Sequence, residues 1–377
     1  MDPITTSAPP SATTDKAAQQ RANAAVPKVR TRKDGAAIPL DESDKQLLNL
    51  LQSSFPLEPR PFLPIATQLG VSEEAVLKRT QELLDARIIR ELTPIFDTRA
   101  LGYSSLLVAA RVDPDNPHRA AKVINAHPGV SHNYLRNHDF NLWFTIATPP
   151  DSKLGLERTL EILADEAGAD SVRQLPTLKL FKINMNLEME KGTEILAAPA
   201  IESLERSLQP VELTELDYAV IKHLQGQLPV VSEPYAPAAE AIGITVPALL
   251  EHLEQMVERG LLRRVAAILF HRRAGFSANG MGVWNVPEDQ IATIGPQMAS
   301  FRGISHCYQR PTYEDWPYSV FTMAHGRSKE ECDTILDEIA AATGIEDRST
   351  LYSSTEFKKI RLRYFTDEYA QWEASRL

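Results

Sequence analysis

Apolar residues recur at helical spacing in three short segments that begin near residue 40. The first segment follows the acidic turn Asp41–Asp44, the second runs from Phe62 to Leu69 and stops at Gly70, and the third follows Ser72. Acidic residues in a first turn and a serine N-cap are typical helix starts, and glycine is a typical helix end. The β-rich stretch Ile88–Leu92 comes next. Three helices followed by a strand predict a winged helix-turn-helix.

The pattern changes between residue 101 and about residue 190, where strand-like and helix-like stretches alternate. Strands are predicted at 103–112, 130–136, 140–148 and 172–187, and helices at 117–127 and 153–168. The order βαββαβ is the ferredoxin-like pattern.

The whole pattern then occurs a second time. Leu40, Asp44, Pro61, Gly70 and Arg90 correspond to residues 173 positions later, namely Leu213, Asp217, Pro234, Gly243 and Arg263. In the later part Gly129 corresponds to Gly303 at an offset of 174, and Phe144-Thr145 correspond to Phe321-Thr322 at an offset of 177. This shift places three extra residues in the second hairpin, within 311–317. Such self-similarity predicts two copies of one two-domain unit.

The predicted fold is therefore α+β, a tandem repeat of a winged helix-turn-helix and a ferredoxin-like domain. We expect a disordered tail at 1–37 and a linker at 191–210. The winged helix-turn-helix domains are expected at 38–100 and 211–273, and the ferredoxin-like domains at 101–190 and 274–377. Two ferredoxin-like sheets on one chain can pair about a pseudo-twofold axis, as homodimers of such domains do.

One short polar motif stands in a predicted strand of each half. The first copy reads Val-Ser-His132-Asn-Tyr134-Leu-Arg136, and the second reads Ile-Ser-His306-Cys-Tyr308-Gln-Arg310. Because side chains alternate along a strand, each His, Tyr and Arg triplet is expected on one face. A single copy could equally be a hydrogen-bonded polar edge of a sheet, but two copies in register favour a functional site.

Composition narrows the class of protein. The chain has 377 residues, 43% hydrophobic and 24% charged residues, and a formal net charge of −10, which argues against non-specific nucleic-acid binding as a main role. No apolar run is long enough for a membrane span, and no secretory signal is evident. Two cysteines, Cys307 and Cys332, do not make a disulfide framework, so a cytoplasmic location is expected.

The helix-turn-helix units suggest DNA binding, but their charges do not. The expected contact helix of each half has equal numbers of basic and acidic residues, which are Lys78, Arg79, Arg87 and Arg90 against Glu73, Glu74, Glu82 and Asp85, and Arg259, Arg263 and Arg264 against Glu251, Glu254 and Glu258. A helix that reads DNA normally carries surplus cations on one face. DNA is therefore an unlikely partner by charge.

Chemistry at the polar motifs is the alternative. Histidine can bind metals or move protons near neutral pH, and arginine can hold carboxylates with two hydrogen bonds. A zinc site formed by His127, His132 and His138 is less favoured, because strand geometry separates them and no cysteine pair supports them. An anionic ligand that carries its own metal would explain histidine and arginine together.

The tandem unit resembles the Lrp/AsnC regulators, and the motifs at 129–145 and 303–326 are more specific. They are similar to those of the siroheme decarboxylases, a family derived from that regulator fold. The first half looks like the B-type, NirD-like subunit and the second like the A-type, NirL-like subunit, and the resemblance covers about residues 40–365. It implies decarboxylation of two ring acetates of siroheme to give 12,18-didecarboxysiroheme, in heme d1 biosynthesis. No added cofactor is implied, because the substrate brings its own iron.

The resemblance gives the motif residues expected roles. His132 and His306 are expected to ligate the substrate iron or act as general acids, Tyr134 and Tyr308 to orient the substrate or donate protons, and Arg136 and Arg310 to anchor its carboxylates. His138, which has no histidine counterpart in the second half, is a secondary substrate-binding candidate.

The family also implies partners. NirG- and NirH-like subunits accompany some members, and a homo-oligomer would be in keeping with the fold. The alternative functions are a tetrapyrrole-sensing transcriptional regulator and an amino-acid-sensing regulator of the Lrp type.

Overall fold

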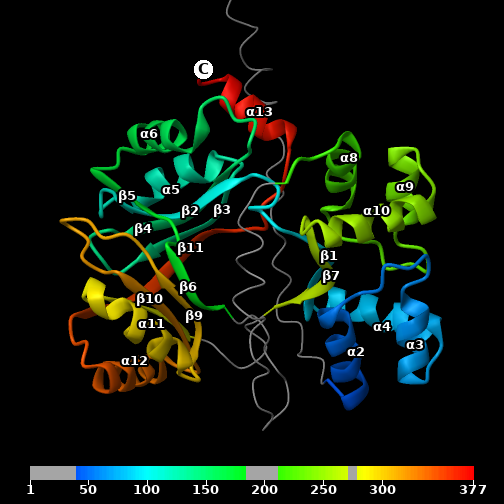
Figure 1. Ribbon diagram of the computed structural model, residues 1–377, viewed down its shortest axis with the longest axis horizontal. Coiled ribbons are helices and arrows are strands. Elements are labelled where there is room, and N and C mark those ends of the chain that lie inside the picture. Colours follow the sequence, from blue (N-terminus) through cyan, green and yellow to red (C-terminus); the bar gives the residue numbers. More distant parts are fainter. Residues whose placement is uncertain (1–39, 184–210, 271–277) are drawn as a thin grey trace, which may run out of the picture. The chain divides into compact units, whose positions relative to one another are not determined.

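The computed structural model describes residues 40–183, 211–270 and 278–377 (Figure 1). The tail predicted at 1–37, the linker predicted at 191–210 and the last four residues of the strand predicted at 172–187 lie outside the described residues.

Each half begins with three helices and one strand. These are α2 (Glu42–Ser53), α3 (Phe62–Leu69), α4 (Glu73–Asp85) and β1 (Ile89–Phe96), and then α8 (Glu215–Leu224), α9 (Ala236–Ile242), α10 (Val246–Glu258) and β7 (Leu262–Leu269). Asp41 and Thr214 begin α2 and α8 with capping boxes. Gly70 and Gly243 end α3 and α9 in the left-handed conformation, with φ of 67° and 83°. The predicted helix-turn-helix units are confirmed.

The strands that follow the helices pair with each other across the two halves. β1 and β7 form a two-stranded antiparallel sheet in which Thr93 lies opposite Ala266. Arg263 on β7 also forms a 2.6 Å salt bridge with the buried Asp97, which follows β1. The wing of each helix-turn-helix is thus completed by the other half.

The ferredoxin-like domains follow the predicted βαββαβ order in both halves. The first contains β2 (Ser104–Arg111), α5 (Pro117–Ala126), β3 (Val130–Arg136), β4 (Leu142–Thr148), α6 (Gly155–Ala167) and β5 (Ser171–Leu175). The second contains β8 (Ala278–Trp284), the 3₁₀ turn η3 (Glu288–Gln290), α11 (Ile291–Ser300), β9 (Ile304–Gln309), β10 (Val320–Gly326), α12 (Lys329–Thr343) and β11 (Arg348–Lys359), and α13 (Asp367–Ala374) ends the chain. None of the described helices is long and apolar enough to cross a membrane.

The last strand of each half crosses into the sheet of the other half. The first part of β11 pairs with β8, and residues from Ser353 to Lys359 pair with β3. In the first half, β5 pairs with β2 and a separate strand, β6 (Lys179–Ile183), pairs with β9. The result is one nine-stranded sheet with the order β5-β2-β4-β3-β11-β8-β10-β9-β6.

The single strand predicted at 172–187 is therefore wrong in one respect, because it is divided into β5 and β6. Pro176 lies in the break between them. Proline cannot donate a backbone hydrogen bond and has a fixed φ, which accounts for the interruption.

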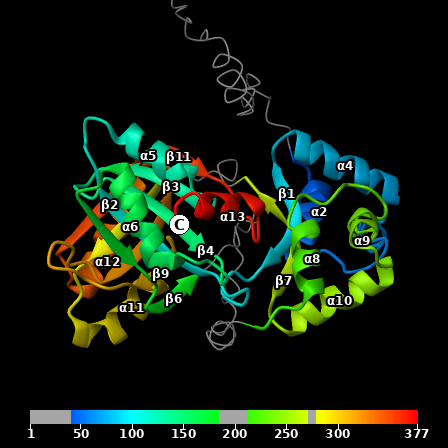
Figure 2. The same cartoon turned by 90° about the horizontal axis from the view of Figure 1, so that it is seen from above.

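Two faces of this sheet carry different cores. Helices α5 and α6 cover the strands of the first half, and α11 and α12 cover those of the second (Figures 1 and 2). The opposite face is buried by apolar side chains from both halves, among them Trp143, Leu175, Trp316, Phe321 and Leu351. The two halves thus share one core on the side away from the helices.

Strand pairing also corrects the register of the repeat. Tyr134 and Tyr308 are 174 positions apart, whereas their cross-strand partners Trp143 and Phe321 are 178 positions apart. The predicted offset of 177 is wrong by one residue, and the second hairpin carries four extra residues rather than three. A shift of one residue moves a side chain to the other face of a strand. The residue equivalent to Trp143 is therefore Phe321, on the same face of the sheet, and not Val320, as an offset of 177 would give.

Candidate functional site

The two polar triplets form rows on β3 and β9, on the sheet face away from the helices. In the first row the rings of His132 and Tyr134 are 6.2 Å apart, and the Arg136 guanidinium lies 5.9 Å from the Tyr134 ring. In the second row His306 and Tyr308 are 6.0 Å apart, and the Arg310 guanidinium lies 5.0 Å from the Tyr308 ring. The alternation predicted for both strands is confirmed.

Each row arginine is held by a backbone carbonyl of the other half. Arg136 donates from Nη1 to the Leu351 carbonyl at 3.0 Å, and Arg310 donates from Nη1 to the Leu175 carbonyl. The Nε atoms of both arginines are buried without a hydrogen-bond partner, and burial lowers the pKa of both guanidinium groups to about 10. Neither arginine forms a salt bridge with a carboxylate of the described residues. A buried cation without a carboxylate favours binding of an anion.

His132 is a neutral imidazole at physiological pH. Its Nδ1 lies 3.0 Å from the Ser131 hydroxyl and 3.4 Å from that of Thr145. Burial lowers its pKa to about 4, and the positive charges of Lys359 and Arg90 act in the same direction. Its Nε2 is therefore the nitrogen suited to ligating a metal or accepting a proton.

His306 is connected to a second histidine that the sequence interpretation missed. Its Nδ1 lies 2.6 Å from the Ser305 hydroxyl, which in turn lies 2.5 Å from Nε2 of His325. The Nδ1 of His325 is 2.6 Å from the side-chain oxygen of Asn279. In the first half the hydroxyl of Ser131 contacts Thr145 instead, at 2.7 Å. The sequence interpretation included His325 in the motif at 303–326 but gave it no role.

The tyrosines stand between the histidine and the arginine of each row. Burial raises the pKa of Tyr308 to about 12, so its phenol stays protonated at physiological pH and can donate a hydrogen bond. Tyr134 lies opposite Trp143, and Tyr308 lies opposite Phe321. Each phenol therefore rests on the shared apolar core.

His138 lies beyond the end of the first row, at the turn between β3 and β4. Its Nδ1 accepts a 3.0 Å hydrogen bond from the Phe140 backbone, and its ring packs against Trp316 of the second half at 5.1 Å. Partial burial lowers its pKa. His138 thus contacts the longer hairpin of the second half. That hairpin corresponds in the repeat to the turn that carries His138.

Two cavities are lined by residues outside the rows. A cavity of about 430 Å³ is lined by residues of β1 and of the segment after β11, including Arg90 and Arg361. Arg90 also contributes to the lowered pKa of His132. A second cavity of about 350 Å³ is lined in part by Arg99 and Pro176. Arg99 also contributes to the pKa values of Tyr308 and Arg310.

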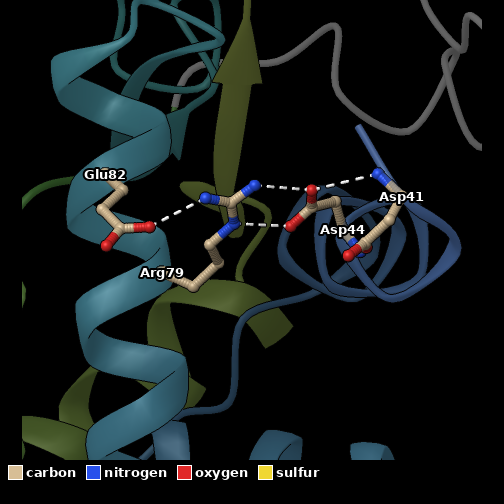
Figure 3. Close-up of polar contacts among 4 residues, drawn as sticks. All are labelled: Asp41, Asp44, Arg79 and Glu82. Atoms are coloured by element: carbon tan, nitrogen blue, oxygen red, sulfur yellow. Dashed lines mark hydrogen bonds and ion pairs between the residues drawn. The ribbon is translucent and has the colours of Figure 1, made fainter. Parts of the chain in front are cut away.

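One position of the expected contact helix in each half makes a contact inside its own domain. Arg79 on α4 donates to both carboxylate oxygens of the buried Asp44, at 2.6 and 2.7 Å, and to Glu82 at 2.8 Å (Figure 3). In the second half His252 takes the place of Arg79 and lies 2.9 Å from the equivalent carboxylate, Asp217. These contacts join helices to each other, as expected for a structural rather than a DNA-reading role.

The zinc alternative receives no support from the placement of His127. This residue is fully buried against Tyr369 and Trp372 of α13, with ring distances of 5.3 and 4.3 Å. Its Nδ1 accepts a hydrogen bond from the Gly129 backbone. Within the described ranges, no group of three or more His, Cys, Asp or Glu residues is arranged to hold a metal ion.

Comparison with known proteins identifies relatives along most of the chain. Residues 44–90 and 217–263 match a family model described as the siroheme decarboxylase NirDL-like HTH domain, and residues 100–182 and 273–358 match the AsnC-like ligand binding domain. A siroheme decarboxylase of Hydrogenobacter thermophilus is 39% identical over 332 residues, which are 88% of this chain and 97% of that protein. The siroheme decarboxylase NirDL subunit of Paracoccus denitrificans is 32% identical over 85% of this chain and 96% of its own length. A crystal structure of siroheme decarboxylase NirDL in complex with an iron-uroporphyrin III analogue superposes with a TM-score of 0.72 at 34% identity, covering 88% of this chain and 98% of that one.

Proposed function

The chain belongs to the siroheme decarboxylase family, and we propose that it is a carboxy-lyase that converts siroheme to 12,18-didecarboxysiroheme, in heme d1 biosynthesis. The structural observation that carries this proposal is the pair of buried arginines, Arg136 and Arg310, which lack a carboxylate and stand beside a histidine and a tyrosine. Siroheme carries an acetate and a propionate on each of its rings, so a site for it must offer cations and hydrogen-bond donors.

The reaction defines what the rows must do. Each step replaces the carboxylate of a ring acetate by a proton, so that –CH2–COO⁻ and H⁺ give –CH3 and CO2. The electron pair of the broken C–C bond needs a sink, which protonation of the ring system would supply. That ring proton is released when a proton reaches the side-chain carbon and completes the methyl group, so each CO2 lost takes up one net proton. Histidine and tyrosine are suitable general acids for this work. Removing the reacting carboxylate from water would favour loss of neutral CO2.

The surroundings of the residues support unequal roles for the two histidines. His132, neutral and flanked by Lys359, suits ligation of the substrate iron. His306, joined through Ser305 to His325, suits proton donation. Arg136 and Arg310 would anchor acetates or propionates, Tyr134 and Tyr308 would orient the substrate or donate protons, and His138 remains a secondary binding candidate.

The reaction as proposed requires no added cofactor, because the substrate carries its iron. We place it in the cytoplasm, which accords with the two buried free thiols, Cys307 and Cys332. NirG- and NirH-like subunits, or a second copy of the chain, are the proposed partners. The internal contacts of Arg79 and His252 with buried carboxylates disfavour DNA as a partner and thus the regulator alternatives.

Anaerobic incubation of the full chain with siroheme, followed by mass spectrometry, tests the proposal. Loss of two CO2 units per molecule is expected. Loss of one unit would indicate that a partner subunit is needed for the second acetate. Retention of the full mass by the wild-type chain, with and without partner subunits, would refute the proposed activity, and wild-type turnover by a His132→Ala/His306→Ala double variant would refute the proposed roles.

A further inference from the structure

The larger of the two cavities lies where three parts of the chain meet. Arg90 and Glu91 come from β1, Gln225 ends α8, and Ile360–Arg363 follow β11. Its volume of about 430 Å³ is within the usual range for small-molecule sites. Gln225 ties the segment in place, because its side chain exchanges hydrogen bonds with the backbone of Tyr364 at 3.0 and 2.7 Å.

The backbone of β11 links this cavity to the first row. Lys359, which precedes the cavity segment directly, is the cross-strand partner of His132 in the pairing of β11 with β3. From the other side, Arg90 is near enough to lower the pKa of His132. The cavity segment thus begins one residue after the cross-strand partner of His132.

The charges in the cavity are unbalanced. Three arginines, Arg90, Arg361 and Arg363, face one carboxylate, Glu91. Arg361 is fixed, since it donates to the Thr93 hydroxyl and the Pro94 carbonyl, and its pKa is lowered by burial and by the neighbouring arginines. Such a concentration of positive charge is unfavourable unless an anion or solvent compensates it.

Arg90 differs from its counterpart in the second half in its charge partners. Arg263 is the counterpart of Arg90, and it is neutralised by the 2.6 Å salt bridge with Asp97. Arg90 and Arg363, in contrast, form no ion pair or side-chain hydrogen bond with the described residues. Among the described residues, Arg263 is therefore neutralised by a carboxylate and Arg90 is not.

We propose that this cavity is a carboxylate-binding subsite of the first row, in which Arg90 and Arg363 select tetrapyrroles that carry acetates as well as propionates. The inference rests on the proposed function and adds the residues that choose the substrate. Arg361 holds the segment against β1, and the two more exposed arginines supply the charge-assisted hydrogen bonds to the ligand.

The test measures binding of two iron porphyrins to the full chain by anaerobic absorbance titration. Iron-uroporphyrin III has an acetate and a propionate on every ring, and iron-coproporphyrin III has a methyl group in place of each acetate. The Arg90→Gln/Arg363→Gln variant is compared with the wild type and with Arg264→Gln, which removes an exposed arginine from β7 outside the cavity.

We expect the double variant to bind iron-uroporphyrin III at least about tenfold more weakly, since each charge-assisted hydrogen bond contributes about a factor of ten. Binding of iron-coproporphyrin III should change less, and Arg264→Gln should match the wild type. Equal affinity of variant and wild type for iron-uroporphyrin III would overturn the subsite, whether or not the wild type releases CO2 from siroheme. Failure of the wild type to release CO2, with the variant still losing discrimination, would overturn the activity and support the subsite.

Discussion

Arg136 of the first half donates a hydrogen bond to the backbone carbonyl of Leu351 in the second half, and Arg310 makes the reciprocal contact with Leu175. Each row is thus built from both halves, although its His, Tyr and Arg come from one strand. The carbonyl satisfies one nitrogen of each guanidinium and leaves Nε without a partner. We interpret each guanidinium group as a cation that the protein positions and that a carboxylate of the substrate would neutralise.

Replacing Arg136 by methionine should separate stability from function. The apolar side chain removes a buried charge but leaves the Leu351 carbonyl without its donor, so the free energy of unfolding should change by no more than about 1 kcal/mol. Siroheme turnover should fall by about a hundredfold or more, because a carboxylate anchor is lost. Urea unfolding measures the change in stability, and single-turnover kinetics of the same preparation measure the change in turnover. A large loss of stability would show that the arginine is mainly structural.

The link between His306 and His325 predicts unequal effects of two serine substitutions. Ser305→Ala removes the hydroxyl that joins the two histidines, so turnover should fall by about tenfold if His306 donates protons. Ser131→Ala, the matched change beside His132, should have a smaller effect because no second histidine is attached there. Mass analysis of products over time distinguishes the variants. Equal losses in both would argue against a special role for His325.

The neutral state of His132 should appear in the pH dependence of stability. Its pKa is about 4 in the folded protein and about 6.5 when unfolded, so the unfolded state binds more protons between these values. Stability associated with His132 is therefore complete above pH 6.5 and is lost as the pH falls toward 4. In His132→Asn, the difference in unfolding free energy between pH 7 and pH 5 should be smaller by about 1 to 2 kcal/mol. Urea titrations at both pH values would measure it, and an unchanged difference would mean that His132 is not buried as described.

The Arg79–Asp44 ion pair should matter for folding and not for chemistry. Arg79→Gln leaves the carboxylate of Asp44 buried without its cation, which should destabilise the chain by about 2 to 4 kcal/mol. Lys78→Gln, an exposed neighbour on α4, should change stability by less than about 0.5 kcal/mol. Thermal unfolding compares the two, and turnover well below the melting temperature should equal that of the wild type. A selective loss of turnover would instead implicate the helix-turn-helix in the reaction.

Local periodicity was sufficient to predict most of the fold and both rows. The strand with His132, Tyr134 and Arg136 was predicted at the same bounds that β3 has, because a period of two is visible within seven residues. The exchange of last strands could not be predicted in this way, since it depends on which edge of a distant sheet is open. Pro176 was visible, but nothing near it in sequence indicates that β6 would pair with β9.

The rest of the site depends on contacts between distant residues. His325 is joined to His306 through the Ser305 hydroxyl, a relation that requires side-chain geometry. Arg90 and Arg363 line one cavity although about 270 residues separate them. The register of the second hairpin was predicted one residue off because identical Phe-Thr pairs align well by sequence, whereas the hydrogen bonds place Phe321 opposite Tyr308.

The exchanged last strands also bear on why the two halves occur in one chain. Without its counterpart, either half would present β3 or β9 as a bare sheet edge, whose unpaired backbone groups invite aggregation. Covalent fusion supplies both halves in equal amounts and at a high effective concentration, so each edge is covered as soon as both have folded. The fusion thereby shortens the time for which each edge is exposed, as well as building the site.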